Sequence, residues 1–269
     1  MDKRIRDFNV RLRTIRLREL AIAIIACFAI TTILSMIFPF LFENDDVYFI
    51  ILLSFVFLFF VFELRNTTGL SKNFEKLLMP NTMREVLYVF AINIIFAFLF
   101  TCLVSGLDLL YGFYDPTWIS GFDIDSVDIS AGAFILSAIA SIIYAPVMEE
   151  LVFRGVLFNR LKIRIGIIPA MLLSSFLFGI GHDFGGITSA FLFGICMCIL
   201  YLKTDNILIP MSVHFINNVV ATLLELTSID VIIGQIPWII PATAITIIAT
   251  VLLIKYIVDE TGKIKNKTQ

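Results

Sequence analysis

The sequence is poor in charge and in the residues that build most soluble active sites. Asp, Glu, Lys and Arg make up 16% of its 269 residues, whereas an ordinary soluble domain has about 25%. The chain has two histidines and four cysteines, and every cysteine lies in an apolar stretch. These scarcities exclude a disordered chain, a coiled coil, a nucleic-acid-binding protein and a disulfide framework.

Apolar residues take the place of the missing charge. They make up 59% of the chain before glycine is counted, with 27 phenylalanines among them. A soluble protein of this size could not bury so much apolar surface. Eight segments approach the roughly 17–25 apolar residues that cross a bilayer as a helix. They are 20–42, 47–62, 86–107, 129–148, 165–181, 187–202, 206–224 and 236–254. The sequence therefore predicts an all-α, multi-pass protein of the cell membrane with about eight transmembrane helices.

The charges are distributed unevenly along this eight-span arrangement. Every Lys and Arg falls on one side of it, and the opposite loops carry acids such as Glu43, Asp45 and Asp123. Cytoplasmic loops collect Lys and Arg. Both termini are therefore predicted to be cytoplasmic.

We divide the chain into four parts. In the first, residues 1–19, Ile5, Phe8, Leu12 and Ile15 recur at helical spacing among arginines. This pattern is typical of an amphipathic helix on the inner leaflet, and a solvated basic tail is the alternative. The other parts are 20–128 (N-terminal transmembrane helices and an outer loop at 119–128), 129–226 (the transmembrane core with the candidate site) and 227–269 (the last transmembrane helix and a cytoplasmic tail).

Few titratable residues lie inside the apolar segments, where such residues are costly and suggest function. Glu149 and Glu150 end the fourth segment, and Arg154 follows one turn later. Glu150 and Arg154 are four residues apart, so they share a helical face and can form an ion pair. Glu149 points about 100° away and is left free to act as a general base. Alternatively, both acids only mark the cytoplasmic end of the segment.

Both histidines of the chain lie in or beside apolar segments. His182 follows Phe178 by one turn, and His214 precedes Asn218 by one turn on the same face, whereas Asn217 points elsewhere. Packed and satisfied histidines are the alternative reading. Counting helical rise from the turns near 164 and 203 places His214 several ångströms shallower than Glu149 and His182, a gap that the sequence does not close.

Small residues precede Glu149 at a spacing of four: Ala133, Ser137, Ser141 and Ala145. Such a face lets helices approach closely, or it lines a groove for an extended peptide. Pro146 has no backbone N–H, so we expect a kink just before the acids.

Three motifs summarise these residues: EExxxR at Glu149–Arg154, FxxxH at Phe178–His182 and HxxxN at His214–Asn218. In this order and at these separations the chain resembles the CAAX protease and bacteriocin-processing (CPBP, ABI) family of intramembrane glutamate proteases, over about residues 129–224. The resemblance implies that Glu149 activates water, that His182 helps to hold this water, and that His214 and Asn218 stabilise the oxyanion. Glu150, Arg154 and Phe178 would support the site.

The function that this pattern favours is an intramembrane endopeptidase that cleaves a peptide, a lipid-anchored protein or a membrane protein. A non-enzymatic membrane regulator or bacteriocin-immunity protein of the same fold is the alternative. The expected partners are the substrate and the lipid bilayer, with an exporter or sensor kinase as a further candidate and no nucleic acid. No metal or cofactor is expected, although Glu149, His182 and His214 form a set that zinc accepts.

Overall fold

The computed structural model describes residues 6–268 except 44, 115–130, 183–185 and 228–235. These residues form helices and no β-strand, and a single parallel bridge joins Asp7 to Thr68. The helices are α1 (Phe8–Thr14), α2 (Leu17–Ile37), η1 (Pro39–Phe42), α3 (Asp45–Leu64), α4 (Leu70–Leu77), α5 (Pro80–Tyr114), α6 (Ala131–Ile139), η2 (Ala140–Tyr144), α7 (Ala145–Glu149), η3 (Glu150–Phe158), α8 (Asn159–Ile165), α9 (Ile167–Gly179), α10 (Ile187–Thr204), α11 (Leu208–Leu226) and α13 (Ile236–Thr268).

The prediction of an all-α multi-pass membrane protein is confirmed. In the described residues, six helical stretches are long and apolar enough to cross a bilayer, and α9 and α11 are shorter apolar helices. Each of the eight predicted segments overlaps one of these eight stretches. The number of crossings and the side of the membrane stay predictions, and the predicted outer loop at 119–128 lies outside the described residues.

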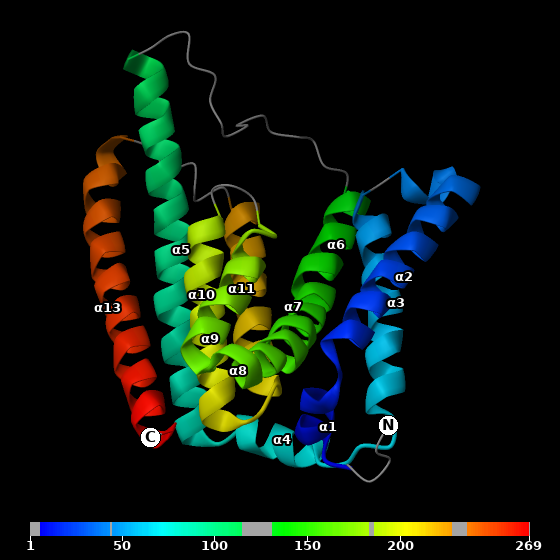
Figure 1. Cartoon of the computed structure of the whole chain (residues 1–269). Helices are drawn as coiled ribbons and strands as arrows, with labels where there is room; N and C mark the ends of the chain where they lie inside the picture. The colour runs from blue at the N-terminus through cyan, green and yellow to red at the C-terminus, as the bar shows by residue number, and fades with distance from the viewer. Residues whose placement is uncertain (1–5, 44, 115–130, 183–185, 228–235, 269) are drawn as a thin grey trace.

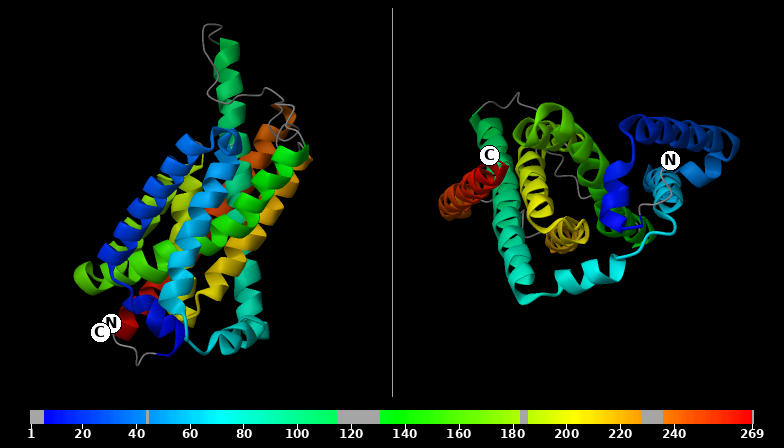
Figure 2. Two further views of the ribbon diagram at one scale, coloured as in Figure 1. Left: turned by 90° about the vertical axis from the view of Figure 1, so that its right-hand side faces the viewer. Right: turned by 60° about the horizontal axis from the view of Figure 1, so that its bottom comes forward.

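The bundle has two helix pairs on its flanks and the candidate core between them (Figure 1). The helix α2 packs along α3 on one flank, and α13 packs along α5 on the other. Between them, the continuous helical stretch from α6 to α8 contacts α9, α10 and α11. Figure 2 shows the same core between the two flanking pairs from other sides.

The elements that hold the basic residues gather at one end of the bundle. Figure 1 shows α1, α4 and the C-terminal end of α13 at this end, while the first turn of α3, with its acids, lies at the other. The separation of charge in the sequence is therefore also a separation in space.

The N-terminal segment packs against the protein through its apolar face. Leu12 and Ile15 are almost fully buried, and a Cβ atom on Gly155 of η3 would lie 2.9 Å from the Leu12 side chain. Arg13 pairs with Asp205 at 2.8 Å, and the Arg160 Nε donates to the Ile15 carbonyl at 2.6 Å. Leu12 and Ile15 thus contribute to the core, and contact of this segment with the inner leaflet stays a prediction.

Local signals in the sequence end the short helices of the core. Gly166 has a φ of +86° and ends α8, with its N–H bonded to the Lys162 carbonyl, as expected for glycine after a helix. Asp205, at a φ of +50°, ends α10. The Asn206 side chain then accepts a hydrogen bond from the Leu208 N–H, which caps the start of α11.

Candidate active site

Glu150 lies at the centre of a buried charge cluster. Its Oε1 atom accepts hydrogen bonds from Arg154 Nη1 at 2.9 Å and from His214 Nδ1 at 3.0 Å. Glu150 and Arg154 are fully buried, and His214 nearly so. Charges in such a place are tolerated only when they are paired and hydrogen-bonded. The ion pair expected from the four-residue spacing is therefore present, and His214 joins it from a helix 64 residues away.

The bond to Glu150 fixes the orientation of the His214 ring. Since a carboxylate only accepts hydrogen bonds, Nδ1 carries a hydrogen in this contact. The other ring nitrogen, Nε2, then faces Glu149, with 3.8 Å between Nε2 and Oε2. The two adjacent glutamates thus contact opposite sides of one imidazole.

Glu149 differs from its neighbour in just the way that the helical spacing predicts. Its Oε2 atom has no hydrogen-bond partner among the described residues, although it is shielded from the outside of the protein. Arg154 pairs with Glu150 and not with Glu149. A carboxylate without a donor, beside a cavity, is free to bind water.

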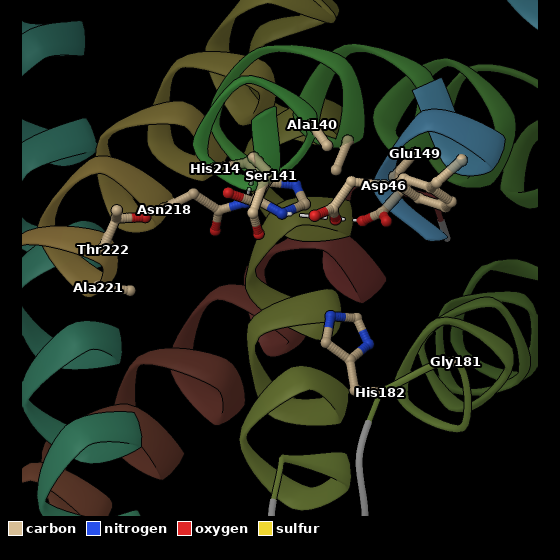
Figure 3. Close-up of a pocket in the computed structure, with 13 residues that line it drawn as sticks. Asp46, Ala140, Ser141, Glu149, Gly181, His182, His214, Asn218, Ala221 and Thr222 are labelled. Carbon is tan, nitrogen blue, oxygen red and sulfur yellow. Dashed lines mark hydrogen bonds and ion pairs between the residues drawn. The ribbon is translucent and has the colours of Figure 1, made fainter. Parts of the chain in front are cut away.

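A cavity of about 550 Å³ lies in front of Glu149. Its walls include His182, His214 and Asn218 (Figure 3). Three members of the small-residue face, Ser137, Ser141 and Ala145, line it as well. This face therefore borders a cavity, and its use as a groove for an extended peptide stays a prediction. The volume is in the range of ligand sites in proteins, about 300–1,000 Å³.

His182 enters the cavity from another wall (Figure 3). It follows the C-terminal end of α9, and its Nδ1 atom lies 3.0 Å from the Phe178 carbonyl oxygen. A carbonyl accepts, so Nδ1 is the donor and Nε2 is the nitrogen that remains for another partner.

Asn218 satisfies a backbone carbonyl that the helix itself cannot. Its Nδ2 atom donates to the Ser141 carbonyl at 2.7 Å. In η2, a π-helical turn, the Ala145 N–H bonds to Ala140 rather than to Ser141. The next residue, Pro146, has no N–H to offer. The amide of Asn218 donates the hydrogen bond that the Ser141 carbonyl lacks within its own helix. The second N–H of this amide can point into the cavity.

Phe178 connects the charge cluster to both histidines. It is buried, and the Arg154 guanidinium lies over its ring at 4.4 Å, within the range of a cation–π contact. The ring centre lies 4.8 Å from that of His182 and 5.8 Å from that of His214. This arrangement fits the supporting role that the resemblance implies for Phe178.

The helix that carries both glutamates is π-helical on either side of α7. Such turns are rare and often occur at functional sites. Asn159 compensates the second one, η3, because its Nδ2 atom donates to the carbonyls of Arg154 and Gly155 at 2.8 and 2.9 Å. Pro146 is a signal that can be seen in the sequence. The contacts of Asn218 and Asn159 with backbone carbonyls have no such signal.

A glycine on α10 makes room for Arg154. A Cβ atom on Gly194 would lie 3.1 Å from Arg154 Nη2 and 3.0 Å from the Ser175 Cβ atom. Gly194 was not singled out in the sequence, because an isolated glycine in an apolar helix carries no signal of its own.

The depth gap left open for His214 is closed in the structure, since its ring touches both glutamates. The estimate of depth from helical rise holds only if the fourth helix continues straight toward the cytoplasm. In Figures 1 and 2, α8 runs across the bundle instead, so the turn at Gly166 lies away from the end where α10 meets α11.

The donor groups do not converge as metal ligands do. In the part of the chain that the structure describes, no three His, Cys, Asp or Glu side chains are grouped to hold a metal ion. Zinc therefore stays an alternative from the sequence that the described residues do not test.

Comparisons with known proteins point to the same segment. Residues 131–220 match the family model described as type II CAAX prenyl endopeptidase Rce1-like. Over 92 residues the chain is 32% identical to the "Putative membrane peptidase YdiL" of Bacillus subtilis (strain 168). The aligned part spans 34% of this chain and 38% of that relative. No solved structure matches the chain.

In this multi-pass helical protein, Glu149, both histidines and Asn218 line one cavity, and Glu150 lies buried beside Glu149. The match at 131–220 covers all three motifs. This segment is similar to the CAAX protease family, and the resemblance seen in the sequence is confirmed.

Proposed function

We propose that this protein is a membrane endopeptidase in which Glu149 activates a water molecule. The observation that carries the proposal is the division of labour between the two glutamates. Glu150 is fully buried and its Oε1 atom accepts hydrogen bonds from Arg154 and His214, whereas Glu149 Oε2 has no donor among the described residues and Glu149 lines the cavity. Only one carboxylate of the pair is thus available to chemistry.

The substrate would lie along the small-residue face of the cavity. Ser137, Ser141 and Ala145 leave room for an extended backbone beside Glu149. The substrate class is a peptide segment of a lipid-anchored or membrane protein, because the cavity lies within the membrane-spanning bundle. A peptide held there has its scissile carbonyl near both the carboxylate and the imidazole, which is the main contribution of positioning to catalysis.

Hydrolysis then needs two proton transfers, and Glu149 can perform both. It takes a proton from water held between itself and His182 as the water oxygen attacks the carbonyl carbon. The carbonyl π electrons move to oxygen, and the second N–H of Asn218 and the Nε2–H of His214, which is then an imidazolium with its Nδ1–H on Glu150, stabilise this oxyanion. When the intermediate collapses, the C–N bond breaks and Glu149 gives its proton to the departing amine. No metal takes part in this scheme.

Replacing Glu149 by Gln tests the proposal. The amide has the same size but cannot accept a proton, so proteolysis should fall to background while the amount of folded protein stays the same. Peptide profiling of membranes from wild-type and Glu149→Gln cells measures the first, and thermal melting in detergent the second. Turnover near the wild-type rate would remove Glu149 as the base.

The same variant separates an enzyme from a regulator of the same fold. A Glu149→Gln protein that restores the phenotype of a deletion strain would support the non-enzymatic alternative. Loss of the purified enzyme's activity on treatment with a metal chelator, with recovery on adding zinc, would contradict the metal-free scheme.

A further inference from the structure

A second, smaller cavity lies behind the wall of the candidate active site. It has a volume of about 140 Å³ and is lined by residues of four helices, among them Asn93 of α5, Phe178 of α9, Phe193 of α10 and Asn217 of α11. His182, His214 and Asn218 line this cavity and the larger one. These three residues therefore lie between the large cavity and the small one, and we call them the partition.

The small cavity has several polar groups in its wall although it lies within the bundle. The Asn217 Oδ1 atom is fully shielded and has no hydrogen-bond partner among the described residues. Asn93 is buried, and its Nδ2 atom is engaged by the Val89 carbonyl at 2.8 Å. A buried amide oxygen without a donor is costly inside a membrane protein. The cavity thus calls for an occupant that donates hydrogen bonds.

Water fits this requirement in size and chemistry. A cavity of this volume has room for several water molecules, and each water needs two to four polar partners. Asn217, Asn218 and His182 line this space and can provide such partners, while both nitrogens of His214 already face the glutamates. Apart from its polar groups, the lining includes the rings of Phe178 and Phe193, which leave little for a larger polar ligand to bind.

We propose that the small cavity is a water chamber that supplies the attacking water to Glu149 through the partition of His182, His214 and Asn218. This inference rests on the proposed function, since it assigns the source of the water that the hydrolysis consumes. A peptide in the large cavity displaces water from that side and shields Glu149. The chamber lies on the opposite side of the partition, so it stays filled while the peptide is bound, and His182 and His214 contact both spaces.

The presence of water can be measured without any substrate. A millisecond X-ray pulse generates hydroxyl radicals from ordered water, and these oxidise adjacent side chains. In the purified full-length protein, Phe193 should be oxidised because it lines the small cavity, while Phe158, which is fully buried and lines neither cavity, should not. Phe193 as unreactive as Phe158 would show a dry cavity and overturn the proposal.

The role of the chamber can be tested with variants that differ in the room they leave. Asn217→Leu keeps nearly the same volume but is apolar, whereas Asn217→Ser keeps a hydroxyl and leaves space for another water. Ala190→Val adds bulk to the chamber from α10 without removing any polar group. Asn217→Leu and Ala190→Val should each lower kcat by about tenfold, the effect of one lost hydrogen bond to the water. KM should stay the same, and Asn217→Ser should remain close to wild type.

Two readouts together keep this test separate from that of the proteolytic mechanism. Asn217→Leu should lose the oxidation of Phe193 while it keeps the wild-type melting temperature and affinity for a peptide inhibitor. If the oxidation is lost and kcat is unchanged, the water is structural and the supply role is wrong. If Asn217→Ser lowers kcat as much as Asn217→Leu, the amide itself is required and the chamber is not. Failure of the Glu149 mechanism would instead appear as an active Glu149→Gln enzyme.

Discussion

At the scale of single residues, the site depends on which polar groups are satisfied and which are not. The two adjacent glutamates differ because Glu150 accepts hydrogen bonds from a cation and an imidazole, whereas Glu149 only faces that imidazole at 3.8 Å and lines the cavity. Asn218 adds a third case, since one of its N–H groups supports the helix backbone and the other is available to the cavity. Substitutions should separate these roles.

Glu150→Ala should lower stability as well as activity. Arg154 would then be buried without its carboxylate partner, and His214 would lose the acceptor that orients it. Breaking a buried pair in this way costs about 3–5 kcal/mol. The melting temperature in detergent and the abundance in membranes measure the loss. The double variant Glu150→Ala/Arg154→Ala should recover part of the stability, and a single variant as stable and active as wild type would exclude a bracing role.

Asn218→Ala should lower kcat by roughly 10²–10³ with little change in KM, as expected when one oxyanion donor is lost. It should also lower stability by about 1–3 kcal/mol, because the Ser141 carbonyl is left without a donor. Asn217→Ala is the matched control on the same helix, and it should be much milder since Asn217 lines only the small cavity. Equal kinetic losses at the two positions would contradict the oxyanion assignment.

At the scale of elements, the α6–α8 stretch explains how the site is assembled. In its two π-helical turns, backbone carbonyls accept hydrogen bonds from asparagine side chains. Asn218 of α11 donates to the Ser141 carbonyl, and Asn159 of α8 donates to the carbonyls of Arg154 and Gly155. The helix α10 in turn packs closely on η3, at the point where Gly194 faces Arg154. The position of Arg154 is thus set by its helix and by the smallest residue on a neighbouring one.

Gly194→Ala tests this close packing. The added methyl group would crowd Ser175 and the Arg154 guanidinium, and such overpacking costs about 1–3 kcal/mol. A lower melting temperature and a lower kcat should appear together. Gly262→Ala on α13 is the control, because no atom lies within 4 Å of its added Cβ atom. It should leave activity unchanged and raise stability slightly, since alanine favours a helix over glycine by about 1 kcal/mol.

At the scale of the whole molecule, charge and apolar surface arrange the chain around the membrane. The basic elements meet at one end, where Lys203 of α10 pairs with Glu85 of α5 and Glu260 of α13. Tyr256 of α13 also donates to Glu85, at 3.1 Å. These contacts join the flanking pair of helices to the core at the end that we predict to be cytoplasmic.

Cysteine labelling in intact cells tests that orientation. Lys72→Cys lies in α4 at the basic end, and Asp45→Cys lies in the first turn of α3 at the acidic end. A membrane-impermeant maleimide should label the cysteine at 45 and reach the one at 72 only after the cells are opened. Cys27, Cys196 and Cys198 are buried and should give little background, and both variants carry Cys102→Ser. The reverse pattern would contradict cytoplasmic termini.

The sequence predicted the parts of this molecule that depend on local spacing. Eight apolar segments became eight helical stretches, and the four-residue spacing of Glu150 and Arg154 gave the ion pair. Contacts between distant helices could not be obtained in this way. The bond from His214 to Glu150, the fit of Gly194 against Arg154 and the capping of Ser141 by Asn218 depend on how helices turn and cross, which no periodicity encodes.

The placement of the buried cation beside Glu150 on one helix also bears on the order in which the protein is made. His214 leaves the ribosome 64 residues after Glu150, roughly 3–13 s later at about 5–20 residues per second. Until then the newly inserted helix has to shield its own carboxylate from lipid, and Arg154, one turn away, is already there to do so. If the only partner of Glu150 were on α11, this helix would enter the membrane with an unpaired carboxylate. The free energy of inserting an acidic residue at the bilayer centre is about 2.5–3.5 kcal/mol. An ion pair within one helix therefore allows this segment to enter the bilayer before the rest of the candidate site has been synthesised.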